Sequence, residues 1–147
     1  MTPAEMYAKL RRQAFEQTPF GDHPYGVIVE FMQGDLVVTI TAFSTGDASM
    51  YFSTGGGVIG GIGRPAVSEL ARSIVNDVAP LVPQLVRSDA VEPPNAGEYC
   101  FYVLTPSGRF VCRANSTDTV RKDGPEATLV RLCGPLVSLM RELANAG

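Results

Sequence analysis

The clearest indication of the fold is the stretch Val27–Phe43, with the sequence VIVEFMQGDLVVTITAF. Its two runs, Val27–Met32 and Leu36–Phe43, are rich in β-branched residues, which is typical of strands. They flank Gly34-Asp35, where glycine supplies the positive φ that a tight hairpin turn needs. The stretch therefore predicts an antiparallel hairpin with a core face made by the pairs Phe31 opposite Val38, Val29 opposite Ile40 and Val27 opposite Ala42.

The other face of this hairpin mixes apolar and polar side chains. It is too apolar for an ordinary solvent face and too polar for a sealed interior, so we interpret it as a contact surface. Glu30 lies on this face, and its carboxylate would be perturbed if another element covered the face. We favour an exposed carboxylate, because a lone carboxylate without an identifiable partner is weak evidence of acid–base chemistry. The candidate partner-binding residues are Ile28, Met32, Val37 and Phe43.

Three helices are expected around these strands. Thr2-Pro3-Ala4-Glu5 combines an N-cap hydroxyl, a proline for the first helical position and a carboxylate for a capping box, so a helix should run from Pro3 to about Glu16. Pro65 opens a second helix with a regular apolar stripe from Val67 to Val78. A third helix is predicted from about Pro125.

Two further strand regions are predicted. One is a third strand at Ser49–Ser53, and the other is a second hairpin, Tyr99–Thr105 with Arg109–Ala114. If Pro106-Ser107-Gly108 forms a three-residue turn, one face of this hairpin carries Cys100, Tyr102, Leu104, Phe110 and Cys112. The expected fold is thus a single α+β domain over residues 1–147, with an antiparallel sheet of about five strands and three helices in the order α-β-β-β-α-β-β-α.

Composition and charge exclude several classes of function. The 147 residues are 45% apolar and 18% charged, as in a folded domain. A net charge of -3 argues against nucleic-acid binding, which needs a clustered basic face. No apolar run is long enough to span a bilayer, and the N-terminus lacks a signal-peptide layout, so we expect no membrane contact and a cytoplasmic location.

The glycine-rich stretch Thr54–Arg64, TGGGVIGGIGR, admits two interpretations. It contains G-x-G-x-x-G, and its backbone could approach an anion beside Arg64 at a helix start, which makes Thr54, Gly55, Gly56, Gly57, Gly60 and Arg64 candidate ligand-binding residues. Against this, no βαβ unit surrounds the motif, and no Lys-Ser or Lys-Thr follows it. The alternative is a structural connection whose glycines pack against backbone.

The sequence predicts no catalytic residues, no cofactor and no metal site. His23 is the only histidine and lies beside Asp22 and Pro24, which favours a solvated loop. No serine-nucleophile elbow or catalytic-cysteine signature accompanies it. The three cysteines, Cys100, Cys112 and Cys133, form no C-x-x-C pair and are expected to be buried free thiols.

The order of elements resembles the class I chaperones of bacterial type III secretion. The likeness covers the first hairpin at Val27–Phe43, the glycine-marked strand exit before Pro65, and the second hairpin leading to the last helix. It implies a cytoplasmic homodimer, formed through the helix Val67–Val78, that binds an extended partner segment on apolar patches without catalysis. We therefore expect a non-enzymatic, chaperone-like protein-binding domain; the alternative is a small-ligand or phosphate-binding protein that uses Thr54–Arg64.

Overall fold

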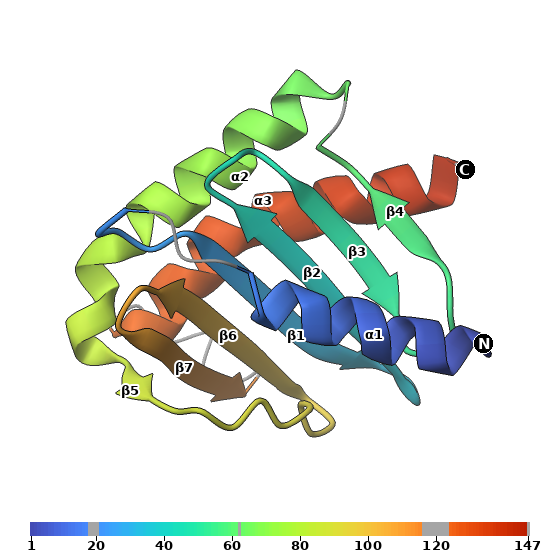
Figure 1. Ribbon diagram of the computed structural model, residues 1–147, viewed down its shortest axis with the longest axis horizontal. Coiled ribbons are helices and arrows are strands. Elements are labelled where there is room, and N and C mark those ends of the chain that lie inside the picture. The colour runs from blue at the N-terminus through green and yellow to red at the C-terminus, as the bar shows by residue number, and fades with distance from the viewer. Residues whose placement is uncertain (18–20, 62, 116–123, 147) are drawn as a thin grey trace.

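A computed structural model of the protein describes residues 1–17, 21–61, 63–115 and 124–146, and Figure 1 shows its elements. An antiparallel sheet has the strand order β4-β3-β2-β1-β6-β7-β5. The strands are β1 (Gly26–Gln33), β2 (Leu36–Phe43), β3 (Ala48–Phe52), β4 (Gly57–Ile59), β5 (Val86–Arg87), β6 (Glu98–Thr105) and β7 (Gly108–Asn115). The helices are α1 (Pro3–Phe15), α2 (Pro65–Asp77), α3 (Pro125–Ala146) and a short 3-10 helix, η1 (Ala79–Gln84).

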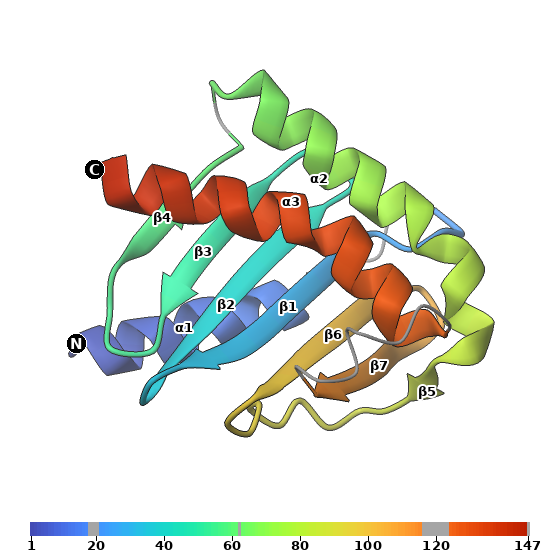
Figure 2. The same cartoon turned by 180° about the vertical axis from the view of Figure 1, so that it is seen from behind.

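The molecule has three layers. α1 lies across one face of the sheet in Figure 1, and the view from behind in Figure 2 shows α2 and α3 crossing the other face. The larger core cluster lies between the sheet and α2 and α3, where Ile40, Phe101 and Leu129 are almost fully buried. A smaller cluster under α1 contains Phe15 and Tyr102.

The predicted α+β class with an antiparallel sheet is confirmed, but the predicted number of elements is too low. The described residues form seven strands rather than about five, and η1 adds a fourth helix. The two missed strands are β4, with three residues, and β5, with two. Strands this short show no alternation that a pattern search can detect. Within the described ranges, no helix is long and apolar enough to cross a membrane.

The first hairpin has the predicted register. Phe31 pairs with Val38, and Val29 pairs with Ile40. Gly34 has a φ of 64°, as the tight turn requires. α1 also begins as predicted, because the Glu5 N–H donates a hydrogen bond to Thr2 Oγ1 over 3.1 Å.

The predicted face of the second hairpin is wrong by one residue of register. Thr105 pairs with Gly108, so the turn contains only Pro106-Ser107, and Phe101 faces Cys112. Thr105 Oγ1 accepts the Ser107 N–H and donates to the Gly108 carbonyl, which closes this two-residue loop. A one-residue shift moves side chains to the opposite face, so Cys112 shares a face with Phe101 and not with Tyr102.

The expectation of an exposed reverse face on the first hairpin is also wrong over its central part. α1 covers it, and both Ile28 and Glu30 have 0% exposure. The cover forms because Phe15 and Ala14 at the end of α1 pack into the smaller core cluster with Ile28. Glu30 is therefore a buried carboxylate rather than a solvated one.

Candidate functional site

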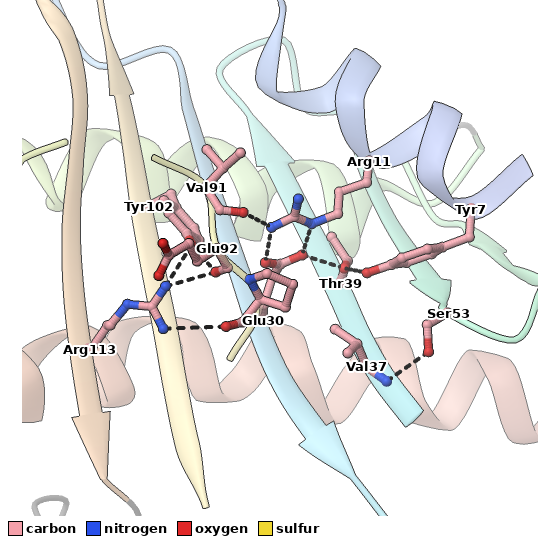
Figure 3. Close-up of polar contacts among 11 residues, drawn as sticks. Tyr7, Arg11, Glu30, Val37, Thr39, Ser53, Val91, Glu92, Tyr102 and Arg113 are labelled. Atoms are coloured by element: carbon pink, nitrogen blue, oxygen red, sulfur yellow. Dashed lines mark hydrogen bonds and ion pairs between the residues drawn. The ribbon is translucent and has the colours of Figure 1, made fainter. Parts of the chain in front are cut away.

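The buried carboxylate of Glu30 is held by side chains from α1 and β2. Arg11 Nε donates to Glu30 Oε2 over 2.6 Å, and Arg11 Nη2 donates to Oε1 over 2.7 Å, which makes a two-point ion pair (Figure 3). Thr39 Oγ1 donates to Oε2 over 2.7 Å, and the Tyr7 hydroxyl lies 2.7 Å from Thr39 Oγ1. Charge pairing with additional hydrogen bonds is what a buried carboxylate needs to be tolerated.

The direction of these hydrogen bonds follows from the number of protons. Thr39 has one hydroxyl hydrogen and gives it to Glu30, so the Tyr7 hydroxyl must be the donor to Thr39. Burial raises the pKa of Tyr7, its hydrogen bond to Thr39 acts against this, and the nearby Glu30 charge raises it further. Tyr7 therefore stays protonated and continues to donate.

The charge of Arg11 is secured by the same contacts. Partial burial lowers the pKa of Arg11, but its hydrogen bonds to Glu30 and the charge of that carboxylate outweigh this, so the pKa lies above its ordinary value. The Arg11 side chain retains 16% exposure. Arg11 therefore stays charged, and its ion pair with Glu30 connects α1 to the sheet.

The proline-containing connection that leads to β6 is anchored by its carbonyl groups. Arg11 Nη2 donates to the Val91 carbonyl over 2.6 Å, and the Tyr102 hydroxyl donates to the Glu92 carbonyl over 2.7 Å. Arg113 Nη2 donates to the same Glu92 carbonyl over 2.8 Å. These bonds place the connection beside α1 as a second wall.

Arg113 is itself held by Glu98. Its Nη1 lies 2.6 Å from Glu98 Oε1. Partial burial raises the pKa of Glu98, but hydrogen bonds from the Asn95 backbone and from Arg113 lower it more, so the net shift is downward. Burial raises the pKa of the neighbouring Tyr102 to about 12, which keeps its hydroxyl a donor to the connection.

A hollow of about 490 Å³ lies between α1 and this connection. Most of its accessible lining is apolar, and we call it the α1 groove. The lining runs from Tyr7 of α1 to the C-cap residue Glu16, nine residue steps that correspond to roughly 14 Å. The residues that line the groove are Tyr7, Ala8, Arg11, Arg12, Phe15, Glu16, Val37, Val91, Pro93 and Arg109.

Arginine side chains of the groove are arranged around one aromatic ring. The guanidinium carbons of Arg11 and Arg109 lie 5.0 and 5.6 Å from the Phe15 ring centroid, within the range of a cation–π contact. Arg109 donates to the carbonyls of Asp89 and Phe15 over 3.2 and 3.4 Å. Among the described residues, neither Arg12 nor Arg109 forms an ion pair with a carboxylate.

The four predicted partner-binding residues do not form one exposed surface. Val37 is half-buried and lines the α1 groove. Met32 is half-buried and pairs with Val37 across the hairpin, outside the groove. Phe43 packs on the smaller core cluster, and Ile28 is fully covered by α1 and unavailable to a partner. Only Val37 is brought to the hollow.

Within the glycine-rich stretch, Gly57–Ile59 forms strand β4, the other described residues lie in turns and loops, and Ile62 lies outside the described residues. The Gly60 N–H donates to the Ala48 carbonyl over 2.7 Å and is therefore not available to an anion. Gly55, with a φ of 112°, lies against Pro3, so that an added Cβ would be 2.4 Å from the proline Cβ. Arg64 Nη1 donates to the Ile59 carbonyl over 3.0 Å.

Of the remaining candidate ligand residues, only Gly57 shows the same close packing. An added Cβ on Gly57 would lie 2.2 Å from the Met50 carbonyl oxygen, whereas Gly56 and Thr54 are exposed. Close packing thus accounts for Gly55, Gly57 and Gly60 without a ligand. Phosphate binding by this stretch stays a prediction to which the geometry adds no support.

The cysteines are free and buried, as predicted. Burial raises the pKa of Cys100 and Cys133 to about 12 and that of Cys112 to about 11. A thiol that stays protonated is a poor nucleophile, so none of the three is suited to catalysis at neutral pH. His23 is exposed in the loop before β1.

The sequence interpretation missed most of the α1 groove. Arg11 carried the usable signal, because Tyr7, Arg11 and Phe15 recur at four-residue steps and therefore share one helix face. A cation within an apolar helix face and a carboxylate within an apolar strand indicate a buried pair between the two elements. Nothing in the sequence indicated that Val91, Pro93 and Arg109 would complete the hollow, since they come from distant segments.

Comparisons with known families, proteins and structures found no significant match to the chain. No protein-family model matches it, and neither a curated protein nor a solved structure shows significant similarity to it. The resemblance to type III secretion chaperones thus stays a prediction based on the order of elements.

Proposed function

We propose that the protein is a non-enzymatic binding domain that holds an extended segment of another protein in the α1 groove. The observation that carries this proposal is a mostly apolar hollow of about 490 Å³ with one helix and one anchored connection as its walls. Extended chain advances about 3.3 Å per residue, so the roughly 14 Å length of the groove suits about four residues. Apolar lining with a few polar groups is typical of peptide-binding grooves.

The surroundings of the groove favour binding over catalysis. The titratable groups at its floor, Glu30 and Arg11, satisfy each other, and Tyr7 is held protonated by burial. Since neither carboxylate oxygen of Glu30 lacks a donor, it is poorly placed to take a proton from a substrate. Buried thiols suit a reducing compartment, so a cytoplasmic location is part of the proposal.

Homodimerisation through α2 has less support. The residues Val67, Ala71 and Ile74 of its apolar stripe are buried against the protein's own core. On the outer side, Glu69 lines the same hollow as Glu142 of α3, so a two-fold contact there would bring like charges together. We therefore propose that the monomer is the unit that binds.

The test is selection of random heptapeptides on the immobilised protein, followed by measurement of their dissociation constants in solution. Ala8 is exposed and lines the groove, so Ala8→Tyr should fill it without disturbing the core. Lys9 is the next exposed position and does not line the groove, which makes Lys9→Tyr the matched control. We expect Ala8→Tyr to weaken binding about tenfold or more and Lys9→Tyr to leave it unchanged.

The proposal fails if no heptapeptide is selected, or if the selected peptides bind Ala8→Tyr as tightly as the unchanged protein. Circular dichroism of the two variants provides the control for helix content. Both substitutions place the same side chain on the same helix, so a loss seen only in Ala8→Tyr identifies the groove.

A further inference from the structure

The residues that line the α1 groove, counted together with the ion-pair partner Glu30, carry a net positive charge. Three arginines, Arg11, Arg12 and Arg109, face a single lining carboxylate, that of Glu16. Buried Glu30 neutralises Arg11, so one positive charge is left over in a chain whose net charge is -3. The protein as a whole is acidic, so this positive charge is local to the groove. A positively charged groove favours ligands that carry negative charge.

The two arginines without ion pairs retain most of their hydrogen-bonding capacity. Arg109 uses two of the five N–H donors of a guanidinium on the Asp89 and Phe15 carbonyls, which leaves three. Those bonds and the Phe15 ring also fix its orientation, which lowers the entropic cost of binding. Arg12 is exposed, and no hydrogen bond of its side chain is found among the described residues.

We propose that the segment bound in the α1 groove presents a carboxylate to Arg12 and Arg109. A guanidinium and a carboxylate match in charge and in planar two-point geometry, and the apolar lining from Ala8, Val37 and Pro93 would receive the flanking side chains. This inference rests on the proposed function, because it names the chemistry of the segment held there. The carboxylate comes from an aspartate or glutamate side chain or from the C-terminus of the partner.

The experiment uses the heptapeptides selected on the protein. Each acidic residue is replaced by its amide, and each peptide is made with a free or an amidated C-terminus, so the two sources of the carboxylate are separated. Affinities are measured for the unchanged protein, for Arg12→Gln and for Arg131→Gln. Arg131 is an exposed arginine of α3 outside the groove, so its substitution changes the net charge equally.

We expect removal of one carboxylate to weaken binding to the unchanged protein about tenfold, and to have a clearly smaller effect on Arg12→Gln. Arg131→Gln should behave like the unchanged protein. Arg109→Lys, which keeps the charge but loses the planar donor pair, should also weaken binding, provided that its unfolding midpoint is unchanged. Added salt should weaken the binding of the acidic peptides more than the binding of their amide forms.

The outcomes separate this inference from the function on which it rests. Some selected peptides could bind the unchanged protein equally well with and without a carboxylate, yet fail to bind Ala8→Tyr. That result would overturn the inference and leave groove binding intact. A carboxylate effect of equal size in the unchanged protein and in Arg12→Gln would also overturn it. Failure to select any groove-dependent peptide would remove the proposed function, and the inference with it.

Discussion

The two faces of the sheet are covered by different chemistry. Under α2 and α3 the core is made of apolar side chains such as Ile40, Ile74 and Leu129, all nearly fully buried. Under α1 a smaller apolar cluster lies beside the buried ion pair of Arg11 and Glu30. One face is thus held by apolar burial, and the other by a combination of apolar burial and defined polar contacts.

The two kinds of contact have different roles: apolar burial mainly stabilises the fold, whereas the ion pair mainly positions α1. A buried ion pair adds little stability compared with apolar residues of the same size, because both charges must be removed from water. Its geometry is directional, however, and Arg11 bonds at once to Glu30 on β1 and to the Val91 carbonyl on the connection. The pair therefore holds α1 and the connection at the separation that leaves the groove between them.

The substitution Arg11→Met tests the polar contribution under α1 most directly, because it leaves Glu30 buried without its charge partner. We expect a loss of about 3–5 kcal/mol in the free energy of unfolding, measured by urea denaturation. Leu129→Ala on the other face should cost about 3 kcal/mol through the cavity it creates. Arg12→Met at the exposed neighbouring position is the control, with an expected change within about 0.5 kcal/mol.

The two losses differ in how they can be repaired. Adding Glu30→Met to Arg11→Met removes the unpaired carboxylate, so the double variant should recover at least half of the lost stability. The same Glu30→Met change should not rescue Leu129→Ala, since that defect lies on the opposite face. If Arg11→Met proved as stable as the unchanged protein, the ion pair would not be the polar anchor of α1.

The glycine-rich stretch extends the contrast between rigid and adaptable contacts, because Gly57 packs against the sheet and Gly60 packs against α3. Gly57→Ala would push a Cβ against the Met50 carbonyl in the sheet, and rigid backbone cannot move aside, so we expect a cost of about 2 kcal/mol. Gly60→Ala meets the Met140 sulfur of α3 instead. A thioether at the end of a flexible side chain can move, so the cost should be below about 1 kcal/mol.

Thermal unfolding of the two glycine variants, with and without inorganic phosphate, checks this expectation. If close packing is the role of these residues, phosphate should not shift the midpoint of the unchanged protein, and Gly57→Ala should be the less stable variant. A phosphate-dependent rise in midpoint that both substitutions abolish would instead support the anion-binding interpretation.

The two hairpins show how far the sequence predicts the fold. In the first, Gly34 fixes a turn whose length is unambiguous, and the whole register from Phe31 to Val27 follows from it. In the second, Pro106-Ser107-Gly108 fits both a three-residue turn and a two-residue turn followed by glycine. The Thr105 hydroxyl stabilises the shorter turn through two hydrogen bonds. The alternation of apolar and polar residues along the strands gives no sign of these bonds.

The candidate site was less predictable than the fold for a similar reason. Helix and strand periodicity predicts which side of an element is buried, but not which element covers it. Glu30 was placed on the correct face and assigned the wrong environment, because the position of α1 over that face depends on tertiary packing. Tyr7, Arg11 and Phe15 share one helix face in the sequence pattern, yet their common partner is visible only in the structure.

The last contrast concerns the thiols, which are present on both faces. Cys100 lies in the cluster under α1, and Cys112 and Cys133 belong to the core under α2 and α3. Burial raises each thiol pKa from 9.0 to about 11 or 12, so the unfolded chain releases these protons first as the pH rises. Their contribution to stability is therefore complete below about pH 9 and is lost progressively above it.

Urea denaturation across this alkaline range should show stability falling, with each thiol contributing on the order of 1 kcal/mol per pH unit. Cys133→Ala removes one thiol from the larger core and should flatten the fall by that share, whatever its effect at neutral pH. Cys100→Ala should flatten it similarly from the α1 side, because desolvation is the leading cause of the shift in both places. An unchanged slope in Cys100→Ala alone would mean that water reaches the thiol beneath α1, and that this layer opens more readily than the layer formed by α2 and α3.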